Sequence, residues 1–136
     1  MTTVVFACVQ NAGRSQMAAA LFNALADPAK AQAVSAGTEP ADRVHPEVVA
    51  AMREVGIDLG AARPRRLTPE LTAGAGLLVT MGCGATCPVV PGLRRLDWPL
   101  ADPKDAPPAV VRAVRDEIRA RVAALIAAAG WERPGR

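Results

Sequence analysis

The chain has 136 residues, 51% of them apolar and 3% aromatic, and 16 Lys and Arg against 13 Asp and Glu give it a net charge of +3. This length is typical of a single domain, residues 1–136, with one core that needs no disulfide. The small, scattered charge argues against a nucleic-acid partner, and no apolar run reaches the roughly 18 residues of a membrane span. The N-terminus carries no basic and apolar leader, so we expect a cytoplasmic protein.

Strands and helices are predicted to alternate along the chain. In chain order, apolar patterns and turn residues predict a strand over 3–7, a helix over 15–26, a strand over 32–35, a helix over 46–55, a capped helical turn over 67–71, a strand over 76–80, a short strand over 94–97 and a helix over 109–129. This alternation predicts an α/β fold with a parallel sheet covered on both faces. Ligand sites in such folds lie beyond the carboxyl ends of the strands.

The last predicted helix is amphipathic, and its two faces can be assigned from their spacing. The stripe expected to face the core consists of Val110, Val111, Val114, Ile118, Val122 and Leu125. The opposite face, expected to be solvated, carries Arg112, Arg115, Glu117, Arg119 and Arg121.

Three cysteines, Cys8, Cys83 and Cys87, are the feature that points to function. An odd number of thiols in a reducing compartment favours chemistry over structural bridges. A zinc site with His45 as its fourth ligand is an alternative, but a second close pair of ligands is missing, so we expect no metal. Cys8 follows the first predicted strand and Cys83 follows the strand over 76–80, so both lie at the edge where ligands bind.

Cys8 opens a loop that ends at Arg14 and a helix start. Unpaired N–H groups and the positive helix end meet there, which predicts a cradle for a tetrahedral oxyanion. Arg14 can add a bidentate pair of hydrogen bonds, and the positive field favours a thiolate nucleophile at Cys8. Ser15 is expected to cap the helix and to donate to the sulfur, and Gly13 to allow close approach. Asn11 is expected either to adopt left-handed geometry or to shape the loop through hydrogen bonds. The expected oxyanion-binding residues are Val9, Gln10, Asn11, Ala12, Gly13, Arg14 and Ser15.

A combination of short motifs covers nearly the whole chain. The first strand leads into Cys8-Val9-Gln10-Asn11-Ala12-Gly13-Arg14-Ser15. The further motifs are Ser35-Ala36-Gly37-Thr38, His45-Pro46, Val79-Thr80-Met81-Gly82-Cys83, Cys87-Pro88 and the segment from Trp98 to Pro103. Together they resemble the low-molecular-weight phosphatase superfamily, specifically its arsenate reductase branch. The resemblance implies a three-layer αβα sandwich with a four-stranded parallel sheet and flavodoxin-like topology.

The resemblance also implies a mechanism. The thiolate of Cys8 attacks arsenate while Asp102 protonates the departing oxygen, and Cys83 then attacks Cys8 and releases arsenite. Cys87 moves the disulfide to Cys83–Cys87, where an external reductant opens it. The implied reductant is thioredoxin, with no tightly bound cofactor; in a related branch the thiol mycothiol and mycoredoxin serve instead, and only Cys8 is indispensable.

Two other functions are alternatives: a phosphatase and a non-catalytic oxyanion-binding module. In tyrosine phosphatases of this superfamily the general-acid Asp-Pro is followed by aromatic residues, whereas Asp102-Pro103 is followed by Lys104-Asp105 and the chain has no Tyr. This favours arsenate over an aryl phosphate. Some members bind potassium through a carboxylate on the first helix; residues 18–20 are all Ala, so we expect no tight potassium site.

Overall fold

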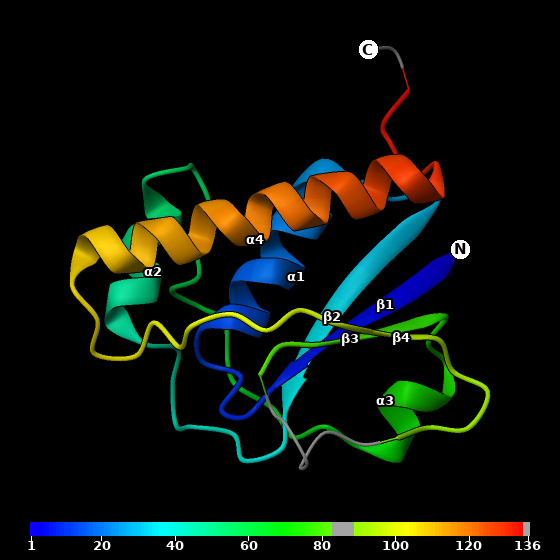
Figure 1. Cartoon of the computed structure of the whole chain (residues 1–136), viewed down its shortest axis with the longest axis horizontal. Helices are drawn as coiled ribbons and strands as arrows, with labels where there is room; N and C mark the ends of the chain where they lie inside the picture. The colour runs from blue at the N-terminus through cyan, green and yellow to red at the C-terminus, as the bar shows by residue number, and fades with distance from the viewer. Residues whose placement is uncertain (83–88, 135–136) are drawn as a thin grey trace.

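The computed structural model describes residues 1–82 and 89–134. Its elements, in chain order, are β1 (Thr2–Cys8), α1 (Arg14–Leu25), β2 (Ala31–Gly37), α2 (Pro46–Arg53), α3 (Pro69–Ala73), β3 (Leu77–Thr80), β4 (Arg95–Asp97) and α4 (Pro108–Ala129). The four strands form one parallel sheet in the order β2-β1-β3-β4 (Figure 1). The predicted alternation and the parallel sheet are confirmed.

The sheet separates two apolar clusters and so forms the middle layer of an αβα sandwich. Successive side chains of β1 point to opposite faces of the sheet, so Val4 and Phe6 join the large cluster under α1 and α4, whereas Val5 and Ala7 join a small one with Leu78. In Figure 1, α1, α2 and α4 lie on one side of the sheet and α3 on the other. The strand order corresponds to the flavodoxin-like order, which confirms the predicted topology.

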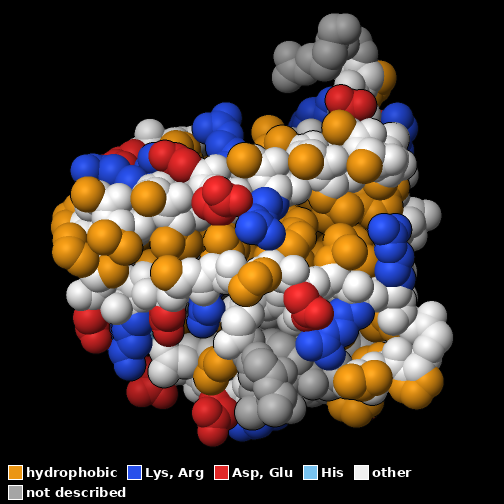
Figure 2. Space-filling view, viewed as in Figure 1, with side chains coloured by type: hydrophobic (Ala, Val, Ile, Leu, Met, Phe, Trp, Pro, Cys, Tyr) orange, Lys and Arg blue, Asp and Glu red, His pale blue; other side chains and the backbone are white. Residues whose placement is uncertain are grey.

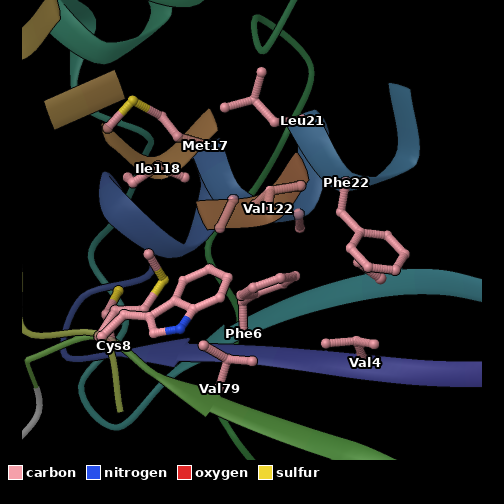
Figure 3. Packing of buried hydrophobic residues seen from close by; sticks show 14 of the residues in the cluster. Val4, Phe6, Cys8, Met17, Leu21, Phe22, Val79, Ile118 and Val122 are labelled. Carbon is pink, nitrogen blue, oxygen red and sulfur yellow. The ribbon is translucent and has the colours of Figure 1, made fainter. Parts of the chain in front are cut away.

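The few aromatic residues form one continuous chain of rings through the large cluster. The ring of Phe6 lies 6.0 Å from that of Phe22 and 5.7 Å from that of Trp98, and Trp131 lies 5.8 Å from Phe22. Figure 3 shows Phe6 and Val4 pointing from β1 toward α1 and α4. The rings therefore connect the central strand with α1, with the segment after β4 and with the chain beyond α4.

The start of α1 differs from the prediction that Ser15 caps the helix. The helix begins at Arg14 with Gly13 as its N-cap, and no side chain caps it. The hydroxyl of Ser15 is engaged elsewhere, with Asn11 and Cys8. This is the physical reason why a good capping residue does not cap here.

Two assignments on α4 were also wrong. Val110 was expected to face the core but is 43% exposed, and Arg115 was expected to be solvated but is buried. The guanidinium of Arg115 donates to the carbonyl of Ala51 and to Glu54, each at 2.8 Å. The buried stripe runs through Val111, Val114, Ile118, Val122 and Ile126. This stripe leaves Val110 one position outside it and places Arg115 beside α2.

The surface agrees with the scattered charge of the sequence. On the face in Figure 2, basic and acidic side chains are interspersed over α4 and the segments below it. Among the described residues, none of the helices has the length and apolar character that crossing a membrane requires.

Candidate active site

Cys8 occupies the carboxyl end of the central strand β1, where its side chain is 3% exposed (Figure 3). Its Sγ lies 2.8 Å from Oγ of Ser15, as the sequence predicted. Asn11 donates a hydrogen bond from Nδ2 to the same Oγ at 2.8 Å. Because an amide nitrogen can only donate, the proton of the Ser15 hydroxyl remains available to the sulfur.

The loop from Cys8 to Arg14 turns its carbonyl groups outward. The carbonyls of Cys8, Val9, Gln10 and Ala12 accept hydrogen bonds from the backbone N–H groups of Thr38, Glu39, Ala41 and His45, at 2.8–3.1 Å. The N–H groups of residues 9–14 donate to no acceptor within residues 1–82 and 89–134. A loop whose carbonyls are bonded on the outside while its N–H groups are unpaired can receive an anion with several oxygen atoms.

Asn11 fixes the shape of this loop. Its φ of 51° is in the left-handed region, which confirms the prediction for this residue. Its Oδ1 accepts hydrogen bonds from the backbone N–H of Arg65 at 3.0 Å and from Nε2 of Gln16 at 3.2 Å. Gln16 also donates to the carbonyls of Asn11 and Arg63, at 3.1 and 3.3 Å. Sequence reasoning assigned neither Gln16 nor Arg65 a role in shaping this loop.

Arg14 and Asp102, far apart in the sequence, meet at the mouth of the loop. Nη1 of Arg14 donates to the carbonyl of Leu100 at 2.9 Å, and Nη2 lies 3.7 Å from Oδ2 of Asp102. The Arg14 side chain is 9% exposed and that of Asp102 is 52% exposed, so the carboxylate can be reached from solvent. The structure therefore brings the predicted anion-binding arginine and the predicted general acid together.

The turn that carries Asp102 is held against the loop from three directions. Pro103 Cγ lies 3.3 Å from the position that a Cβ would take at Gly13. Trp98 is buried against Phe6, and its backbone N–H donates to the carbonyl of Thr80 at 2.8 Å. These contacts place Pro103 against the loop and Trp98 in the core, on either side of Asp102.

The third contact comes from the first turn of α2. Oε2 of Glu47 accepts a hydrogen bond at 2.6 Å from the N–H of Asp105, whose φ is 58°. Partial burial acts to raise the pKa of Glu47, but backbone N–H groups of Glu47 and Asp105 outweigh it, so the pKa lies below its usual value of 4.5. Glu47 therefore stays ionised and keeps the turn attached to α2.

The remaining residues singled out in the sequence are Cys83, Cys87 and His45. Cys83 and Cys87 lie outside the described residues. Met81, just before them, donates its N–H to the carbonyl of Ala7 at 2.8 Å, which places the chain leading to Cys83 beside the end of β1. His45 is the N-cap residue of α2, and its side chain makes no capping hydrogen bond. Within the described ranges no three His, Cys, Asp or Glu side chains are grouped as a metal site requires.

Gly37 and Leu100 belong to the quoted sequence motifs, but sequence reasoning gave neither of them a role in the site. A Cβ at Gly37 would overlap the carbonyl oxygen of Val9 and lie 2.9 Å from the nitrogen of Asn11, so the end of β2 is pressed against the loop. Its position at a predicted strand end was the available signal. Leu100 contributes a backbone carbonyl, for which the side-chain sequence contains no signal.

A Cys-x5-Arg loop between β1 and α1, at the carboxyl edge of this sheet, is the arrangement expected of a low-molecular-weight phosphatase. Residues 3–133 match the low molecular weight phosphotyrosine protein phosphatase family, and the chain belongs to that family.

Relatives within the family are named for arsenate reduction. The chain is 38% identical over 126 residues to a putative arsenate reductase of Halobacterium salinarum, covering 88% of this chain and 87% of that protein. It is 34% identical to a glutaredoxin arsenate reductase of Synechocystis, covering 93% and 98%. Among solved structures, a thioredoxin-dependent arsenate reductase of Corynebacterium glutamicum superposes with a TM-score of 0.81 at 36% identity; the match covers 94% of this chain and 61% of that one.

Proposed function

We propose that this protein is an arsenate reductase in which Cys8 is the nucleophile. The observation that carries the proposal is the loop from Cys8 to Arg14, whose N–H groups are unpaired within the described residues and which begins at a thiol hydrogen-bonded to Ser15. A tetrahedral oxyanion fits such a loop. The names of the relatives support arsenate as that oxyanion.

In the first step, the loop N–H groups and the guanidinium of Arg14, which is positioned by the carbonyl of Leu100, bind arsenate. The Cys8 thiolate, which accepts a hydrogen bond from Ser15, attacks arsenic and forms an S–As bond. One As–O bond breaks, and Asp102 donates the proton with which that oxygen leaves as water. Arsenic remains in oxidation state V in this adduct.

In the second step, the thiolate of Cys83 attacks Sγ of Cys8. The S–As bond breaks, its electron pair stays on arsenic, and arsenite leaves while a Cys8–Cys83 disulfide forms. Cys87 then attacks Cys83, which frees Cys8 and leaves a Cys83–Cys87 disulfide. This step rests on the sequence resemblance and on thiol chemistry, because both cysteines lie outside the described residues.

The proposed electron donor is thioredoxin, in a cytoplasmic setting that keeps thiols reduced. The name of the Corynebacterium structure supports this choice, whereas the Synechocystis relative is named for glutaredoxin. Mycothiol with mycoredoxin is the alternative, and it would require only Cys8. Cys87 is the residue that separates these two routes.

A coupled assay tests the proposal. Arsenate-dependent oxidation of NADPH is measured with thioredoxin and its reductase, with glutaredoxin and glutathione, and with mycothiol and mycoredoxin. We expect the wild type to turn over with thioredoxin and the Cys87→Ser variant to lose this turnover. If Cys87→Ser turns over only in the assay with mycothiol and mycoredoxin, the protein uses the mycothiol route. Absence of arsenite in all three assays, together with rapid aryl phosphate hydrolysis, would overturn the assignment.

Phosphate monoester hydrolysis is a second candidate, favoured by the placement of Asp102 beside Arg14, which would serve a phosphoryl group equally well. The same assay distinguishes the two activities. A wild type inactive in both assays, with a Cys8→Ser variant that binds phosphate or arsenate as tightly as the wild type, would instead support a non-catalytic oxyanion-binding module.

A further inference from the structure

The guanidinium of Arg14 lies directly against the backbone of Gly82. A Cβ placed at Gly82 would overlap Nη1 and would lie 3.2 Å from Cζ and 3.7 Å from Nη2 of Arg14. The backbone at Gly82 has a φ of 87°, in the left-handed region that favours glycine. The backbone conformation at Gly82 and the space occupied by Arg14 therefore both disfavour a side chain at position 82.

Both Gly82 and the guanidinium of Arg14 are held in place by contacts with their surroundings. On one side, Met81 is fully buried and its N–H is bonded to Ala7, so the chain arrives at Gly82 in a fixed position. On the other side, Arg14 is held by the carbonyl of Leu100 and by Asp102. The guanidinium thus occupies a space bounded by Gly82 and by the segment that carries Asp102.

We propose that Gly82 is a positioning residue that seats the Arg14 guanidinium for anion binding. A side chain at position 82 would displace Nη1 and Nη2 together, and a bidentate interaction with an oxyanion tolerates little displacement of its planar donors. The inference rests on the proposed function only in that the anion binds in the Cys8 loop. It assigns to Gly82 a contact with Arg14, beyond the backbone freedom that a glycine supplies in any loop.

Two other glycines provide matched controls. Gly56 and Gly92 both have a φ of 82°, and a Cβ at either would meet nothing within 4 Å. Gly56→Ala and Gly92→Ala therefore introduce the same left-handed strain as Gly82→Ala without contact with a neighbour. Any difference between Gly82→Ala and these controls reports the overlap with Arg14.

The experiment measures binding of inorganic phosphate to the reduced protein by calorimetry, with a denaturation midpoint for each variant. We expect Gly82→Ala to bind phosphate roughly tenfold more weakly than the wild type, the loss of about one charge-assisted hydrogen bond, and the two controls to bind within about twofold of it. In steady-state assays with arsenate, Gly82→Ala should raise KM more than it lowers kcat.

A double-mutant cycle tests whether the effect passes through Arg14. In an Arg14→Ala background, Gly82→Ala should change the phosphate affinity no further, since the overlapping guanidinium is gone. If Gly82→Ala alone does not fold, the double variant is expected to fold for the same reason; a double variant that also fails to fold would contradict the proposal.

The outcomes separate this inference from the proposed function. Two results would overturn the role of Gly82 and leave the proposed function intact. The first is that Gly82→Ala binds phosphate as tightly as Gly92→Ala. The second is that Gly82→Ala weakens phosphate binding in the Arg14→Ala background as well. A wild-type protein that binds neither phosphate nor arsenate overturns the oxyanion site, and the role of Gly82 with it.

Discussion

The thiol of Cys8 belongs to a short chain of hydrogen bonds that starts at an amide. Asn11 donates to Ser15, which leaves the hydroxyl proton of Ser15 for the sulfur 2.8 Å away. A hydrogen bond to a charged acceptor is about twice as strong as one to a neutral acceptor, so this donor stabilises the thiolate more than the thiol. At the residue scale, Ser15 therefore acts on the thiolate that we propose as the nucleophile.

Ser15→Ala removes this donor. We expect the single-turnover rate of adduct formation to fall roughly tenfold, with phosphate affinity nearly unchanged, because the loop N–H groups and Arg14 remain. Rapid-quench measurement at saturating arsenate checks the rate. Ser35→Ala is the control, since its hydroxyl lies outside this chain of hydrogen bonds; equal losses in both variants would argue against a specific role for Ser15.

Asp102→Asn tests the general acid. Loss of the transferable proton should lower kcat about 100-fold. Phosphate affinity should be kept or slightly increased, because a neutral amide competes less with the anion for Arg14. Asp105→Asn is a suitable control, since Asn tolerates the left-handed backbone at that position. A kcat of Asp102→Asn close to that of Asp105→Asn would remove Asp102 from the mechanism.

At the scale of elements, α2 and α4 are joined by one carboxylate. Glu54 accepts hydrogen bonds at 2.7–3.1 Å from Arg112 and at 2.8 Å from Arg115, both on α4. Hydrogen bonds from Arg112, and then from Arg115, lower the pKa of Glu54 from 4.5 to about 2. Glu47, also on α2, is hydrogen-bonded to the turn that carries Asp102. The ion pairs of Glu54 therefore help to position that turn indirectly, by fixing α2 against α4.

The lowered pKa predicts a dependence of stability on pH. A carboxylate whose pKa is lower in the folded state stabilises the fold above the unfolded pKa, and this contribution is lost as the pH falls through the folded pKa. The wild type should therefore lose an increment of stability between pH 4.5 and about 2 that Glu54→Gln lacks. Urea midpoints measured across this range, with Glu70→Gln as control, check it; parallel curves for wild type and Glu54→Gln would contradict the account.

At the scale of the whole molecule, the aromatic rings connect the core with the site. Phe6 contacts Trp98, and Trp98 begins the segment that leads to Leu100 and Asp102. Phe6→Leu should lower the free energy of unfolding by about 1–2 kcal/mol, because it shortens the buried side chain and removes two ring contacts. Val110→Ala, at an exposed position of α4, should change it by less than about 0.5 kcal/mol. Urea denaturation of both variants measures the difference.

Local sequence patterns were sufficient to predict the parallel sheet and the position of Cys8 at the end of a strand, because both depend on neighbouring residues. The β-branched run at Val4 and Val5 forms the central strand, and the Cys8 loop follows it. The burial of Arg115 was not predictable, since it depends on where α2 packs. The contact of Arg14 with Gly82 joins two loops that only the folded sheet brings together.

The most direct test of the account mixes the reduced protein with arsenate in the absence of any external reductant. If Cys8 starts a reduction that ends in a disulfide between the other two cysteines, the wild type should release about one arsenite per chain while two thiols disappear. Cys8→Ser should release none and lose no thiols. Arsenite from Cys8→Ser, or none from the wild type while phosphate esters are hydrolysed, would contradict the central claim.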